Sequence, residues 1–77
     1  MQPNKKTRHI GENIAAIRHI KKLKQKALAD RLNISQQALS KIENSTTVSR
    51  GTLLHIAEGL DVAVSTIENF DQLELRL

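Results

Sequence analysis

The sequence has no cysteine, no tryptophan and no tyrosine, and only one proline and one phenylalanine among its 77 residues. Without cysteine there can be no disulfide, no cysteine-held metal site and no cysteine nucleophile. No apolar run is long enough to cross a bilayer, and the opening segment lacks the hydrophobic stretch of a secretory signal. We therefore expect a cytoplasmic or nucleoid-associated protein whose core is built from Ile, Leu, Val and Ala.

The sequence also lacks the motifs of catalytic and ligand-binding sites. It contains no Gly-rich phosphate loop, no nucleophile elbow and no paired carboxylates of the kind that line a catalytic cleft. The spacing of His9, His19 and His55 matches no metal-ligand pattern, so surface or half-buried neutral side chains are expected. We expect no enzyme activity, no metal, no cofactor and no small-molecule substrate.

Charge is unevenly distributed along the chain, whose formal net charge is +4. Residues 1–50 contain eleven Lys and Arg residues against three acidic ones, a net +8, and residues 51–77 contain one Arg against five acidic residues, a net −4. One end of the molecule should attract phosphate and the other repel it, which would orient an approaching duplex. Lysine-rich helices that only keep a protein soluble would give the same balance, so charge alone does not decide between these interpretations.

The most informative segment is residues 25–44, QKALADRLNISQQALSKIEN. It predicts two short helices, 25–32 and 36–44, joined by a tight turn. Ala29 is small enough for the place where the helices cross, and Asn33 suits a left-handed backbone position. Ser35 is placed to cap the second helix. This arrangement is typical of the DNA-binding helix-turn-helix, whose second helix enters the major groove.

Further helices are predicted on both sides of this segment. The first begins at Ile10 and turns Ile14 and Ile17 inward, with Ile20 as a further candidate. The fourth is capped by Ser49, and the fifth has Ser65 as its candidate cap. The residues expected to be buried after the motif are Leu53, Leu54, Ile56 or Ala57, Leu60, Val62, Val64, Ile67 and Phe70.

These elements predict an all-α fold, a compact five-helix bundle over residues 10–70. A basic flexible arm, residues 1–9, precedes it, and a tail, residues 71–77, follows it. The tail alternates Leu73, Leu75 and Leu77 with polar residues, which suits a strand that pairs with its copy in a second subunit. A frayed end or an extra helical turn is the alternative.

The residues that would read bases lie on the second helix of the motif. Gln36 and Gln37 open this helix, and glutamine can both donate to and accept from the edge of adenine. Ser40 and Lys41 lie one turn further along the same face, where Lys41 can reach a guanine or a phosphate. Simple solvation of the start of a helix is the alternative interpretation for the two glutamines.

Three segments resemble the Cro/cI-like (XRE) phage-repressor helix-turn-helix family: IGENIAAIR, LKQKALADRLNIS followed by QQALSKIEN, and LLHIAEGLDVAVSTI. The resemblance covers residues 10–70 and implies a lambda-repressor-like bundle. Members are mostly transcriptional repressors or activators that bind palindromic operators as dimers, and a minority are antitoxins. This chain departs from the family in having Asn33 and Ser45 where glycine is usual. Lys22 also stands where glycine often ends the first helix, so we expect a less sharply turned junction there.

The resemblance also implies roles outside the recognition helix. The Gln25 amide is expected to meet a DNA phosphate, with Lys24 adding charge. Arg18 and Glu43 are expected to form a partly buried structural salt bridge. Donors to phosphate on the other flank of the groove are expected from the segment that follows the recognition helix, Asn44, Ser45, Thr46 and Thr47.

The sequence therefore predicts a transcriptional regulator that binds double-stranded DNA as a homodimer, most simply a repressor. One alternative is an antitoxin that controls its own operon and has a toxin as a protein partner. Another is a protein-interaction module that uses the same scaffold without DNA.

Overall fold

The computed structural model describes residues 10–70, which form five helices without a strand. The helices are α1 (Ile10–Ile20), α2 (Gln25–Leu32), α3 (Gln36–Glu43), α4 (Arg50–Leu60) and α5 (Val64–Glu68). The predicted all-α bundle is confirmed. The predicted arm, residues 1–9, and tail, residues 71–77, lie outside the described residues.

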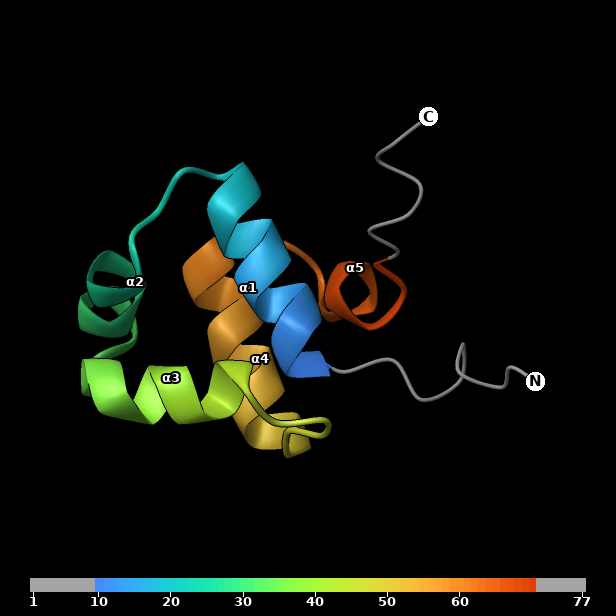
Figure 1. Cartoon of the computed structure of the whole chain (residues 1–77). Helices are drawn as coiled ribbons and strands as arrows, with labels where there is room; N and C mark the ends of the chain where they lie inside the picture. The colour runs from blue at the N-terminus through green and yellow to red at the C-terminus, as the bar shows by residue number, and fades with distance from the viewer. Residues whose placement is uncertain (1–9, 71–77) are drawn as a thin grey trace.

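Helices α1 and α4 lie at the centre of the fold and contact each other (Figure 1). Figure 1 shows α3 lying across one end of this pair, with α2 on one side and α5 on the opposite side. Seven side chains from all five helices are completely or almost completely buried between them: Ile14, Leu28, Leu32, Leu39, Ile56, Leu60 and Ile67. Their burial holds α3 against α1 and α2 against α4.

Three predictions about the helix surfaces were wrong. Leu54 is 49% exposed, because α4 turns Leu53 and the residues one turn further along toward the core and leaves Leu54 on the outer side. Ile20 is 53% exposed at the last position of α1. Ser65 lies inside α5, whose N-cap is Ala63 and has no side-chain cap.

Helix α2 is fixed on α4 by two reciprocal hydrogen bonds. The Arg31 guanidinium of α2 donates to the Gly59 carbonyl at 3.0 Å, and His55 Nε2 of α4 donates to the Leu32 carbonyl at 2.8 Å. Gly59 permits this close approach, since a Cβ at that position would lie 2.5 Å from Leu32 Cδ2. The first helix of the motif therefore has a defined position on the bundle.

The start of α1 packs directly against the end of α3 and the loop that follows it. The Ile10 and Gly11 N–H groups donate to the carbonyls of Thr46 and Ser45 at 3.1 and 3.0 Å. A Cβ on Gly11 would lie 2.6 Å from the carbonyl oxygens of Glu43 and Ser45. Only glycine fits there, and the contact fixes the route of the α3–α4 loop.

Helices α1, α2 and α4 end in the same way, in a Schellman motif. At the end of α1 the Leu23 N–H donates to the Arg18 carbonyl at 3.1 Å and the Lys22 N–H to the His19 carbonyl at 2.9 Å. The left-handed residues of the three motifs are Lys22, Asn33 and Asp61, with φ of 60°, 62° and 62°. The expectation of a less sharply turned junction at Lys22 was wrong. Lysine adopts the conformation that glycine favours, at about 1–2 kcal/mol of strain.

Candidate nucleic-acid interface

The turn between α2 and α3 has the local structure that the sequence predicts. Ala29 is 1% exposed at the contact between the two helices. Asn33 is left-handed, and its N–H donates to the Asp30 carbonyl at 3.1 Å. Ser35 Oγ accepts a hydrogen bond from the Ala38 N–H at 3.0 Å and so caps α3. The turn thus fixes α3 with its amino-terminal end at the surface.

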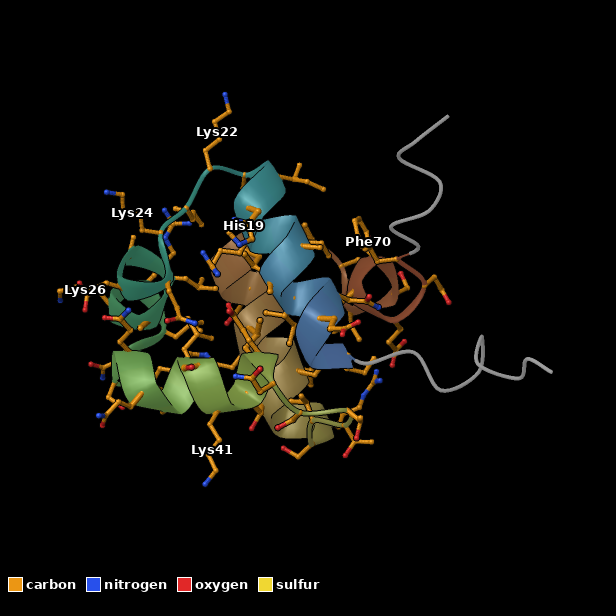
Figure 2. All side chains as sticks on the ribbon, in the orientation of Figure 1. His19, Lys22, Lys24, Lys26, Lys41 and Phe70 are labelled. Carbon is orange, nitrogen blue, oxygen red and sulfur yellow. The ribbon has the colours of Figure 1, made fainter. Side chains whose placement is uncertain are left out.

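The four residues expected to read bases lie along the outer side of α3. Gln36, Gln37 and Lys41 are exposed, and Ser40 is half-buried. Figure 2 shows the Lys41 side chain extending directly away from α3 into solvent. Because these side chains are on one face of a helix held at the edge of the bundle, they are accessible to a large partner.

Beneath α3 the structure contains a buried ion pair between Arg18 of α1 and Glu43 of α3. Arg18 Nε donates to Glu43 Oε2 at 2.7 Å and Nη2 to Oε1 at 3.1 Å, and the two side chains are 8% and 7% exposed. Arg18 Nη1 also donates to the Leu23 carbonyl at 2.8 Å. The ion pair therefore joins the end of α3 to the α1–α2 junction.

Two glutamines extend this ion pair to the protein surface. Gln25 Nε2, at the first position of α2, donates to Glu43 Oε1 at 3.0 Å. Gln36 Nε2, at the first position of α3, donates to Gln25 Oε1 at 3.2 Å. This contact joins an expected phosphate ligand to an expected base reader, and the sequence did not predict it. The available signal was that both glutamines open helices that the turn brings into contact.

The amino-terminal ends of α2 and α3 differ in how they are capped. Lys24 is the N-cap residue of α2 and makes no side-chain hydrogen bond to the helix, and the first turn of α2 contains no acidic residue. The N–H groups at this end keep their partial positive charge available to an anion, in addition to the charge of the exposed Lys24.

The α3–α4 loop presents its four polar residues in two different ways. Asn44 Nδ2 donates to the Ser40 carbonyl and Ser45 Oγ to the Lys41 carbonyl, both at 2.9 Å, so these side chains cap the end of α3. Thr46 and Thr47 are exposed, and their hydroxyls have no hydrogen-bond partner within residues 10–70. Of these four residues, only the two threonines have side-chain donors that are free of partners within residues 10–70.

Positive charge collects along the side of the molecule that carries α2 and α3. Figure 2 shows Lys22, Lys24 and Lys26 projecting from the α1–α2 junction and α2, and Lys41 from α3, on the side away from α5. Of these, Lys26 alone has an ionic partner in the described chain, Asp30 at 3.4 Å. By contrast, α4, α5 and the connection between them carry three described acidic residues, Glu58, Asp61 and Glu68.

Residues 10–70 contain neither a candidate metal site nor a helix that could span a membrane. They contain no cluster of three or more His, Asp or Glu side chains placed to hold a metal ion. His55 is bonded to the Leu32 carbonyl, and His19 Nε2 lies 3.5 Å from Arg18 Nη2. Among the described helices, none combines the length and apolarity needed to span a membrane.

The architecture and the capped α2–turn–α3 unit define a helix-turn-helix domain. A family described as helix-turn-helix matches residues 14–67, a span that includes every described site residue. The chain belongs to the XRE-type (Cro/cI-like) helix-turn-helix family, a family of DNA-binding regulators. A search of curated proteins finds no match.

Proposed function

We propose that the protein is a sequence-specific transcriptional repressor that binds a palindromic operator as a homodimer. The single observation that carries this proposal is the exposure of Gln36, Gln37 and Lys41 on α3, beside the uncapped start of α2. In this proposal the outer face of α3 enters the major groove, and the protein acts in the cytoplasm on the nucleoid.

The two glutamines differ in how much of the side-chain amide is free to contact a base. Gln37 has no hydrogen-bond partner within the described residues, so its whole amide group is available for a bidentate contact with adenine. Gln36 uses one N–H on Gln25 and retains its carbonyl oxygen and a second N–H. Ser40 and Lys41 continue this face toward the other bases of the half-site.

Phosphates on both sides of the groove position the recognition helix. On one side, the open start of α2 with Lys24 and Gln25 supplies N–H groups and positive charge. On the other side, Thr46 and Thr47 offer their free hydroxyls, and Asn44 and Ser45 hold the loop in position through their bonds to α3. Gln25 has a second role here, because its bond to Gln36 couples phosphate contact to base contact.

Dimerisation supplies the spacing that a palindrome needs. Two copies related by a two-fold axis would place their α3 helices about 34 Å apart, in successive major grooves on one face of the duplex. The exposed surface of α5 and the tail, residues 71–77, are the two candidates for the contact.

Selection of bound duplexes from a random-sequence pool tests this proposal directly. We expect convergence on an inverted repeat with half-sites one helical turn apart, and no convergence for a Gln36→Ala, Gln37→Ala double variant. Retention of duplexes without convergence would reduce the function to non-specific DNA binding. Failure to retain any duplex would favour the protein-interaction module instead.

A further inference from the structure

The α1–α2 junction contains four lysines within six residues: Lys21, Lys22, Lys24 and Lys26. All four are exposed. Lys21, Lys22 and Lys24 are absent from every ion pair of the described chain, which are Arg18–Glu43, Lys26–Asp30 and Arg50–Glu68. This junction is therefore a positive patch in which three of the four lysines have no ionic partner within residues 10–70.

Local backbone structure does not favour lysine at two of these positions. Lys22 has a φ of 60°, in the left-handed region where glycine is unstrained and a side chain is not. Lys24 is the N-cap of α2, a position that favours Ser, Thr, Asp or Asn, and its side chain makes no capping bond. Both departures from local preference are to the same charged residue, two positions apart.

The two side chains also project from neighbouring positions on one side of the molecule. Figure 2 shows Lys22 and Lys24 leaving the same outer edge of the molecule, with Lys26 further along it. Leu23 between them packs against the core, and Arg18 Nη1 is bonded to the Leu23 carbonyl at 2.8 Å. The junction is thus anchored at its middle, with lysines projecting on either side of the anchor.

We propose that Lys22 is a phosphate ligand that extends the DNA contact beyond the start of α2, onto the backbone outside the half-site that α3 reads. A lysine ammonium suits this role because it needs only proximity to a phosphate, without a fixed geometry. Each phosphate it neutralises releases condensed counterions, so its contribution is independent of base sequence and falls as salt concentration rises. The inference rests on the proposed DNA-binding function.

The test uses Lys22→Gly, which removes the charge and relieves the left-handed backbone together. Asp61→Gly is the matched control, since it relieves the same position of the same motif at the end of α4. Lys22→Arg keeps the charge. Binding of the full chain and its variants to duplex DNA of scrambled sequence is titrated at several salt concentrations, and urea unfolding is measured alongside.

Both glycine variants are expected to unfold at higher urea concentration than the unmodified chain. Lys22→Gly alone should bind about five- to tenfold more weakly at 0.1 M salt, with a log–log salt slope shallower by about 0.9. Lys22→Arg should match the unmodified chain, and Asp61→Gly should not weaken binding.

An unchanged slope for Lys22→Gly, with duplex binding intact in the unmodified chain, would overturn the inference and leave the proposed function standing. A Lys22→Gly variant that is no more stable than the unmodified chain would remove the argument from backbone strain and with it the inference. An unmodified chain that shows no salt-dependent binding would overturn the proposed function itself, and the inference with it.

Discussion

Helices α2 and α3 each have eight residues and pack against each other, yet only α3 has a side-chain cap at its amino-terminal end. Ser35 closes the start of α3 by accepting a hydrogen bond from the Ala38 N–H. Lys24 leaves the start of α2 without a side-chain cap and adds a positive charge. A helix start without a side-chain cap leaves one more N–H group for an anion than a capped start does. In the proposed function, this difference separates an end that binds phosphate from an end that reads bases.

The two ends are nevertheless connected. Gln25 at the start of α2 and Gln36 at the start of α3 are bonded to each other, and Gln25 is bonded to Glu43. Glu43 in turn pairs with buried Arg18. One buried ion pair therefore supports the starts of both helices.

The largest effect is expected from breaking this ion pair. Glu43→Ala leaves the buried Arg18 guanidinium without its carboxylate partner, and should destabilise the fold by about 3–5 kcal/mol in urea unfolding. The matched control is Asp30→Ala, which breaks an exposed pair with Lys26 and should change stability by at most about 0.5 kcal/mol. Equal effects of the two substitutions would show that the ion pair does not hold the two helices together.

The next largest effect is expected at the start of α1, which packs against the same end of α3. Gly11→Ala places a methyl group against the backbone carbonyls of Glu43 and Ser45, and overpacking of this kind should cost about 1–3 kcal/mol of unfolding free energy. Gly51→Ala is the control, because nothing lies within 4 Å of its Cβ position in helix α4. It should stabilise the protein by up to about 1 kcal/mol. Destabilisation by both variants would contradict the assigned close contact.

A smaller effect is expected from adding an N-cap to α2 and from removing the N-cap of α3. Lys24→Ser gives α2 the cap that it lacks and should raise the unfolding free energy by about 1 kcal/mol, while Ser35→Ala should lower it by about the same amount. Lys24→Ser should also weaken binding to all duplexes and reduce the log–log salt slope by about 0.9. If Lys24→Ser leaves both stability and binding unchanged, α2 and α3 do not differ as we describe.

Sequence pattern alone predicted the features that depend on neighbouring residues. The bounds of α2, the left-handed Asn33 and the Ser35 cap follow from local backbone preference, and each is present. The exposure of Gln37 and Lys41 follows from helical periodicity in the same way.

Features that depend on tertiary packing were not predicted, or were predicted wrongly. Leu54 is apolar and one turn from other core residues, but only the position of α4 on the bundle decides that it faces solvent. The Gln25–Gln36 bond needs the two helix starts to meet in space. At Lys22 the fold keeps a left-handed backbone conformation against the preference of lysine. This conformation lets the Leu23 N–H donate to the Arg18 carbonyl and so ends α1.

The proposed function distinguishes residues that read bases from residues that bind phosphate. Its most direct test is the ratio of operator affinity to scrambled-duplex affinity, measured for Gln37→Ala and Lys24→Ala. We predict that Gln37→Ala lowers the ratio by the equivalent of about 1–3 kcal/mol at one operator position and leaves scrambled-duplex binding nearly unchanged. Lys24→Ala should weaken both affinities equally and keep the ratio constant. A ratio that falls for Lys24→Ala and stays constant for Gln37→Ala would contradict the account.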